Sequence, residues 1–438
     1  MITVCRRRSL TYNNAGGSSI RSGMASFILF SGLVFGCNCT ASVDHTTYPT
    51  SGEVKGPVLE TVTMNWGLAP GVIRLATPRI AAVAKAVEML QGVGVACFQE
   101  LWTQESQDAV IAALGPGMYH YEISTRGENQ RDGVNVCSPD DIKKVAACAR
   151  EKCGSVLAEE QTICVKEECE IELGVEYYTG HKECVYCLVA SVGNSIEDAA
   201  RNCTQMPGGP KIVGVSRAYN GHNGVMLVSR WPLQNPEALR LRASFSNRVA
   251  LFATVDIADF GPIEVACSHI STKEDLPPNH PDFSKWDEEM KAQVSDISRK
   301  QKERAGNNPS LFLVDLNAGP ALDEGRIEGV QYNVWRHTRR LGYFSPVAHA
   351  DIPFCTSCEE NTLRNGSLHT TPNPDEARSN QLIDHVLVRN PSVGAKLLPV
   401  LVQTIFDEVV VYDGYGLRWR SHPSDHYGTR VTFKLFKE

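Results

Sequence analysis

The chain has 438 residues, of which 42% are hydrophobic and 21% charged, and its formal net charge at pH 7 is −7. This composition is typical of a globular protein and excludes a wholly disordered or fibrous chain. The negative charge excludes a basic field over the whole protein for binding nucleic acid, and the length fits one large α/β domain with an insertion, or two to three average domains.

The amino terminus has the order of residues that is typical of a secretory signal. Three consecutive arginines at 6–8 precede an apolar run over residues 27–35, which is too short to span a bilayer comfortably. We predict a signal peptide over residues 1–36, with a start at Met24 as an alternative, and a linker over residues 37–57.

Three N-glycosylation sequons agree with secretion, at Asn38, Asn202 and Asn365. We therefore expect an extracellular glycoprotein. Two alternatives stay open: an uncleaved signal anchor, and a bacterial lipoprotein cleaved before Cys37, for which residues 33–36 are a poor match.

The chain then alternates predicted strands and helices. We predict buried strands at residues 61–65, which follow the apolar pair Val58-Leu59, and at residues 93–98. Residues 79–90 repeat apolar side chains at helical spacing, and residues 107–114 form a second predicted helix. This rhythm indicates an α/β protein.

The rhythm breaks over residues 132–210, which hold eight of the fifteen cysteines. Helix-forming residues fill the spaces between these cysteines, so we expect a disulfide-rich helical insertion. Its pairing stays open, because eight cysteines allow about 105 connectivities. A zinc site through Cys184 and Cys187 is the alternative.

The remaining cysteines are spread over the rest of the chain. Cys355 and Cys358 could close a tight loop, whereas Cys97 and Cys267 lie on predicted core strands and could be free or paired. Cys5 would leave with the signal peptide, so an even number would remain.

After the insertion the α/β pattern resumes. Apolar residues at 286, 290, 294 and 297 form one face of a predicted helix whose other face is charged. The predicted strands in this half are residues 225–229, 249–257, 263–269, 311–314, 383–388, 400–411 and 429–436.

Polar side chains of a few kinds occur at the ends of most predicted strands. They are Asn65, Glu100, His269, Asp315, Asn317, Asp384, Asp425 and His426. In α/β sheets, this is the usual place for a functional site. Carboxylate and amide oxygens suit Mg²⁺, while histidines suit proton transfer. The set therefore predicts metal-assisted hydrolysis of a phosphate ester.

These residues lie in motifs that resemble the endonuclease/exonuclease/phosphatase superfamily, which includes DNase I and the neutral sphingomyelinases. The motifs are residues 63–70 (TMNWGLAP), Arg79, residues 97–102 (CFQELW), residues 223–232 (NGVMLVSRWP), Ser268-His269, Asp315-Leu-Asn317, Ile383-Asp384-His385 and Ser424-Asp425-His426. The resemblance implies a four-layer α/β/β/α sandwich of two packed mixed β-sheets, over residues 58–438, interrupted by the cysteine-rich helical insertion at 132–210.

The resemblance also implies a metal site. Glu100 would be the principal ligand of Mg²⁺ or Mn²⁺, with Asn65 and Asp425 contributing. Two positions depart from the family pattern: Val314 replaces a glycine, which restricts the backbone, and Ser268 replaces a threonine.

The remaining site residues would carry the chemistry. The resemblance implies that His426 acts as general base and that Asp315 orients or activates the attacking water. Asn317 would hold the phosphate, His269 would stabilise or protonate the departing charge, and Asp384 would support a histidine.

The motifs at 65–70 and 99–102 look closer to the sphingomyelinase branch than to DNase I. An apolar and aromatic stretch over residues 409–419 could contact a lipid surface, although ordinary packing would also explain it. We therefore expect a secreted, monomeric phosphodiesterase that acts on a phospholipid membrane surface.

Two other functions stay open. A secreted DNase I-like endonuclease would need a basic track along its substrate, for which the candidates are Arg217, Arg230, Arg240, Arg242 and Arg248. A non-catalytic secreted binding protein would use the insertion and keep the α/β domain as a relic, but the intact set of site residues argues against it.

Overall fold

The computed structural model describes ten stretches of the chain. They are residues 3–4, 57–90, 92–125, 137–154, 161–169, 203–204, 218–273, 280–351, 354–364 and 379–437. The expected signal cleavage near residue 36, the asparagines of the three sequons, Cys184, Cys187 and Arg217 lie outside these residues, so they stay predictions.

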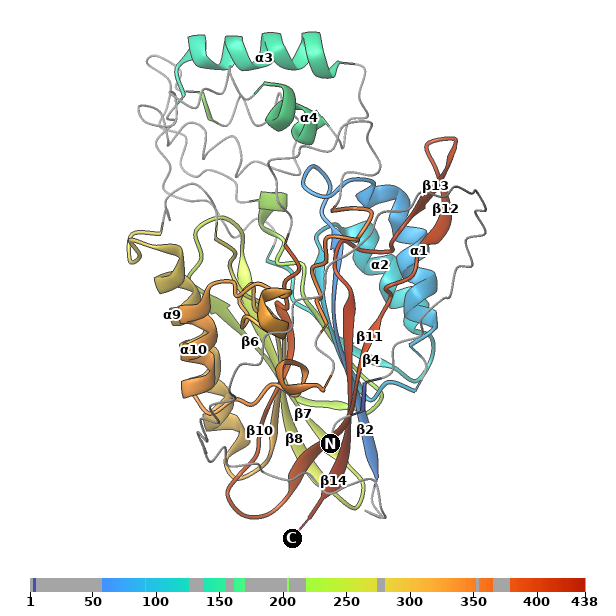
Figure 1. Ribbon diagram of the computed structural model, residues 1–438, viewed down its shortest axis with the longest axis vertical. Coiled ribbons are helices and arrows are strands. Elements are labelled where there is room, and N and C mark those ends of the chain that lie inside the picture. Colours follow the sequence, from blue (N-terminus) through green and yellow to red (C-terminus); the bar gives the residue numbers. More distant parts are fainter. Residues whose placement is uncertain are drawn as a thin grey trace, which may run out of the picture.

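Two mixed β-sheets pack face to face (Figure 1). The first has the strand order β1 (Thr3–Val4), β11 (Lys396–Ile405), β14 (Gly428–Phe436), β2 (Val58–Leu68), β3 (Val95–Leu101), β5 (Met226–Ser229), β4 (Tyr119–Tyr121). The second has the order β10 (Asp384–Arg389), β9 (Ser310–Asp315), β8 (Gly261–His269), β7 (Arg248–Ile257), β6 (Leu233–Leu241). The first sheet contains two parallel pairs, β1 with β11 and β2 with β3, and the second contains one, β8 with β9; the other neighbours are antiparallel.

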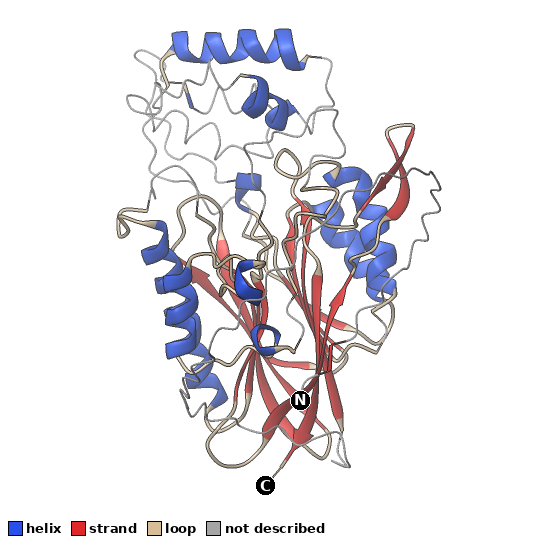
Figure 2. Cartoon of the chain, viewed as in Figure 1, coloured by secondary structure: helices blue, strands red, loops and turns tan. Residues whose placement is uncertain are grey.

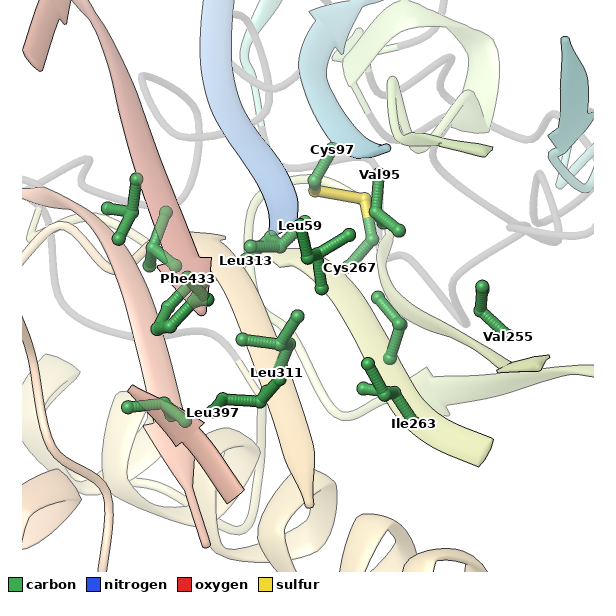
Figure 3. Close-up of a cluster of buried hydrophobic side chains, with 14 of the residues drawn as sticks. Leu59, Val95, Cys97, Val255, Ile263, Cys267, Leu311, Leu313, Leu397 and Phe433 are labelled. Atoms are coloured by element: carbon green, nitrogen blue, oxygen red, sulfur yellow. A yellow bond between two sulfur atoms is a disulfide. The ribbon is translucent and has the colours of Figure 1, made fainter. Parts of the chain in front are cut away.

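The core between the sheets is apolar and contains a disulfide (Figure 3). Leu59 and Phe433 of the first sheet face Leu311 of the second. Cys97 on β3 is bonded to Cys267 on β8, with Cα atoms 5.3 Å apart, so these cysteines are paired and join the two sheets.

Helices cover the outer face of each sheet (Figure 2). The first sheet packs against α1 (Ala76–Glu88) and α2 (Gln104–Leu114), and the second against α9 (Trp286–Ala305) and α10 (Tyr332–Arg340). Because β9 is buried on both faces, its sequence contains a continuous apolar run over residues 311–314. The layers follow the order α/β/β/α, so the predicted sandwich is confirmed.

Two helices of the insertion fall within the described residues, α3 (Pro139–Cys153) and α4 (Gln161–Glu168). Disulfides Cys148–Cys169 and Cys153–Cys164 hold them together. The expected helical character is confirmed for these stretches, which lie beyond the end of the sandwich opposite to the chain termini (Figure 1).

One predicted strand is wrong, and several elements were not predicted, among them β4, β6, β13 (Leu417–Ser421) and α10. Residues 400–411 do not form a single strand: β11 ends at Ile405, Phe406 takes a left-handed φ of 62°, and β12 (Val410–Gly414) then pairs with β13. Strand β6 escaped prediction because most of its side chains are exposed or half-buried without a clear alternation. In the described part of the chain, no helix is both long and apolar enough to cross a membrane.

Candidate active site

Strand ends from both sheets meet at one edge of the sandwich. His269, the last residue of β8, pairs with Asp315, the last residue of β9. Asp384, the first residue of the antiparallel β10, pairs with the other side of Asp315. Asn65 on β2 reaches across from the facing sheet, where its Nδ2 donates a hydrogen bond to Asp315 Oδ2 at 2.9 Å.

The Asn65 side chain connects the two sheets at this edge. Its Nδ2 also donates to Glu100 Oε1 at 3.1 Å, and its Oδ1 accepts from the Gly67 N–H at 2.9 Å. With 1% of its surface exposed, Asn65 has a fixed orientation that holds the two carboxylates close together.

Glu100 has a backbone conformation that is unusual for its residue type. Its φ of 58° lies in the left-handed region, where a side chain is disfavoured and where strain often marks a functional position. The chain then enters α2 through a capping box, in which Thr103 and Ser106 exchange side-chain and backbone hydrogen bonds. The Glu100 carboxylate accepts from Asn65 and lies 4.0 Å from His269 Nε2, so it is close to the strand ends of the second sheet.

His269 lies between the two carboxylates. Its Nε2 is 3.3 Å from Asp315 Oδ2 and 4.0 Å from Glu100 Oε1, and Asn317 Nδ2 is 3.1 Å away. Burial, followed by the positive charges of Arg248 and His426, holds the pKa of His269 well below its usual value. His269 is therefore neutral at physiological pH.

Asp384 and His426 form a buried pair beside this cluster. Asp384 Oδ2 is 2.8 Å from His426 Nδ1, which leaves Nε2 directed toward Asp425, whose Oδ2 is 3.9 Å away. Burial alone would lower the pKa of His426, but the Asp384 and Asp425 carboxylates outweigh it and raise the pKa to about 10.

A glycine and a buried arginine shape the approach to Asp425. Gly67 has a φ of 55°, and a Cβ at this position would overlap the Asp425 carboxylate. Arg79, which is fully buried, donates to the carbonyls of Trp66, Gly67 and Pro423. These bonds tie the segment after Asn65 to the segment before Asp425.

The carboxylates are close enough to perturb one another. Burial and the Asp425 charge raise the pKa of Glu100, while burial and the Asp384 charge raise the pKa of Asp315 to about 7. A cation that shares such carboxylates relieves this repulsion.

The donor atoms are arranged so that a metal ion could bind them. One atom each from Glu100, His269 and Asp315 lies within 4.8 Å of the others, and the same holds for Asp315, Asp384 and His426. Within the described part of the chain, the buried Oδ1 of Asp384 has no hydrogen-bond partner. Oxygen donors of this kind fit a hard divalent cation. A third group, around Cys355 and Cys358, does not fit, because those cysteines are disulfide-bonded.

The structure brings all eight predicted site residues to this one edge. Sequence reasoning missed several residues that surround them. Tyr219 stacks on Trp102 with ring centroids 4.8 Å apart, and Cζ of the buried Arg248 lies 5.7 Å from the centroid of the Trp102 ring. Thr356 and Asn361 contact the segments of Asp384 and Asp425. Trp102 lies in the motif at residues 97–102, and Arg248 is a candidate for the basic track of an endonuclease, whereas no motif marks Thr356 or Asn361.

Comparisons with known proteins agree with the motifs. A model of the Endonuclease/Exonuclease/phosphatase family matches residues 75–426. No curated protein matches the chain significantly.

Solved structures with a similar arrangement share little sequence with this chain. Sphingomyelinase C from Streptomyces griseocarneus has a TM-score of 0.48 and 14% identity, covering 86% of this chain and 99% of its own. A magnesium-bound mutant of beta toxin from Staphylococcus aureus has a TM-score of 0.48 and 11% identity, with coverage of 86% and 99%. An endonuclease/exonuclease/phosphatase family protein from Bacteroides thetaiotaomicron has a TM-score of 0.48 and 11% identity, with coverage of 87% and 99%. Such distant similarities indicate no substrate.

Proposed function

Because the chain belongs to the endonuclease/exonuclease/phosphatase family, we propose that it is a secreted, metal-dependent phosphodiesterase that hydrolyses a phospholipid headgroup ester. The observation that carries the hydrolytic part is the meeting of Asn65, Glu100 and Asp315 with the Asp384–His426 pair at one buried edge. Secretion rests on the sequence of the amino terminus.

The metal would be held by Glu100, Asn65 and Asp425. Mg²⁺, with Mn²⁺ as the alternative, fits these oxygen donors, and it supplies a Lewis acid for the phosphoryl oxygen when bound. Asn65 would have to exchange one of its present contacts, because both its amide oxygen and its amide nitrogen are hydrogen-bonded.

His426 would accept the proton of the attacking water through Nε2. Asp384 holds the opposite ring nitrogen at 2.8 Å, which fixes the tautomer and the orientation of the ring. A pKa of about 10 keeps the proton on His426 at neutral pH, so His426 must lose that proton before it can act as a base. Metal binding at Asp425 would offset its charge and lower that pKa, because Asp425 is one of the three carboxylates that raise it.

The other residues would act by hydrogen bonding. Asp315 would orient the water beside His426, and the Asn317 amide would hold a phosphate oxygen. Because the pKa of His269 is well below its usual value, we expect it to stabilise departing charge by hydrogen bonding and not to protonate it.

A phospholipid surface is the substrate environment that the exposed side chains favour. The β12–β13 hairpin ends shortly before Asp425 and projects from the body of the molecule (Figure 1). Val411, Tyr415 and Leu417 on this hairpin are 53%, 45% and 58% exposed. Exposed apolar and aromatic side chains of this kind favour contact with a membrane surface.

The endonuclease alternative draws less support from the arginines. Arg248 is buried against Trp102, and Arg242 pairs with Asp282 at 2.8 Å, so neither presents a free charge to a nucleic-acid backbone. Arg230 and Arg240 are exposed but do not by themselves make a track.

Parallel assays test the proposal. Purified protein with Mg²⁺ would receive sphingomyelin liposomes in one assay and plasmid DNA in another, alongside His426→Gln and the exposed control His120→Gln. Headgroup release that is lost in His426→Gln and kept in His120→Gln supports the proposal. DNA cleavage with the same pattern selects the endonuclease, and no turnover of either substrate by folded protein rejects both.

A further inference from the structure

A small disulfide-closed loop lies behind the Asp384–His426 pair. The bond between Cys355 and Cys358 closes it, with Cα atoms 5.4 Å apart, and both cysteines pack against Tyr427, the residue after His426. None of the eight predicted site residues belongs to this loop.

One side chain of the loop binds the backbone of Asp384. The Oγ1 of Thr356, which is fully buried, accepts hydrogen bonds from the N–H groups of Ile383 and Asp384, both at 3.1 Å. The N–H groups of Thr356 and Ser357 donate to the Gln381 carbonyl, and the Gln381 N–H donates back to Ser357. The loop therefore fixes the strand entry from which the Asp384 carboxylate projects.

The same stretch holds the other half of the pair. The Thr356 carbonyl accepts the Tyr427 N–H at 2.6 Å. Asn361, three residues beyond the loop and fully buried, donates from Nδ2 to the Ser424 carbonyl at 2.8 Å. These two bonds flank Asp425 and His426 on either side.

The loop thus bridges the two chain segments that must stay in register for Asp384 to reach His426. A displacement of about 1 Å between reacting groups can lower a rate about 100-fold. We propose that the Cys355–Cys358 loop is a positioning element for the Asp384–His426 pair, with Thr356 as its positioning residue. The role in turnover rests on the proposed phosphodiesterase function, whereas the geometric role does not.

Substitutions at Thr356 separate positioning from simple stabilisation. Thr356→Val keeps the shape and removes the oxygen, and Thr356→Ser restores the oxygen. We expect kcat to fall about 10- to 100-fold in Thr356→Val, with KM within about twofold of wild type, and to recover in Thr356→Ser. The matched control is Thr338→Val, which removes another buried hydroxyl, bonded to the Val334 carbonyl on α10.

The disulfide is tested separately. Cys355→Ala/Cys358→Ala should also lower kcat, as Thr356→Val does, because the disulfide that holds Thr356 in place is lost. Cys153→Ala/Cys164→Ala removes a disulfide of the insertion and should leave kcat unchanged.

A readout without turnover keeps the geometric claim separate from the proposed activity. The Nδ1 proton of His426 in its bond to Asp384 should give a downfield proton NMR signal, identified by its absence in His426→Gln. We expect that signal to be lost or shifted in Thr356→Val and retained in Thr356→Ser and Thr338→Val. A lower melting temperature in Thr356→Val with unchanged kcat and an unchanged signal would overturn the proposal. A wild type that turns over no phosphodiester rejects the proposed function, and the signal alone then decides the positioning role.

Discussion

Replacing Asp384 by asparagine changes the charge beside His426 and little else. The carboxylate is fully buried and lies 2.8 Å from Nδ1 of a histidine whose side chain is 10% exposed. Removing one partner of a buried ion pair costs about 3 kcal/mol or more. Since asparagine keeps the shape and one acceptor oxygen, we expect Asp384→Asn to lower the free energy of unfolding by about 3 kcal/mol near neutral pH.

The loss should depend on pH in a defined direction. The pKa of His426 rises from 6.5 in a free side chain to about 10 in the folded protein. A group whose pKa is raised by folding contributes stability that is fully present below its unfolded pKa and is lost as the pH rises through its folded pKa. The pair therefore stabilises the wild type at neutral pH, and this contribution disappears as the pH rises through about 10.

Urea unfolding with a chelator present measures this difference. Wild type and Asp384→Asn would be compared at about pH 7.5 and about pH 10.5, on either side of the folded pKa. Asp315, with a pKa of about 7, titrates mostly below this window. We expect the gap between the two proteins to shrink to less than about 1 kcal/mol at the higher pH. An equal gap at both pH values would refute the ion pair.

Three further predictions follow from the geometry near Asp425. Gly67→Ala should weaken Mg²⁺ binding about tenfold or more in calorimetric titration, because its Cβ overlaps Asp425; Gly416→Ala has a similar φ of 73° in open space and should not. Arg79→Met should lower stability by about 3 kcal/mol in urea unfolding, because three backbone carbonyls lose their donor, and the exposed Arg326→Met should have little effect. Leu417→Asp should reduce cleavage of liposomes about tenfold and spare a soluble phosphodiester, whereas Val393→Asp, at a site 74% exposed, should change neither rate; equal losses on both substrates would remove the membrane role of the hairpin.

The sequence predicted the strands that are buried on both faces, because their composition alone marks them. Strand β9 is an example: Leu311 and Leu313 pack between the sheets, while Phe312 and Val314 pack against the helices, so both faces must be apolar. Strand β6 could not be found in this way, since it forms an edge of its sheet and exposes most of its side chains. The break after β11 also left no clear signal, because Phe406 adopts a left-handed φ without being glycine or asparagine.

Site residues could be predicted where they follow a strand. His269 and Asp315 are adjacent in space because β8 and β9 are parallel and end together, so their positions in the sequence already imply the contact. The contacts of Thr356 could not be predicted, since its partners lie 27, 28 and 71 residues away along the chain. Cys97 and Cys267 show the same limit: at a separation of 170 residues, only the packing of the two sheets determines their pairing.

Magnesium-dependent headgroup release from sphingomyelin liposomes, measured for wild type, Glu100→Gln and the exposed control Glu88→Gln, tests the account most directly. We expect release by wild type that stops with chelator and returns with Mg²⁺, because Glu100 would be the principal ligand. Glu100→Gln should lose about 100-fold or more in kcat, while Glu88→Gln keeps the wild-type rate. Unchanged release in Glu100→Gln, or release by wild type that persists in chelator, would contradict a metal-assisted reaction at this edge of the sandwich.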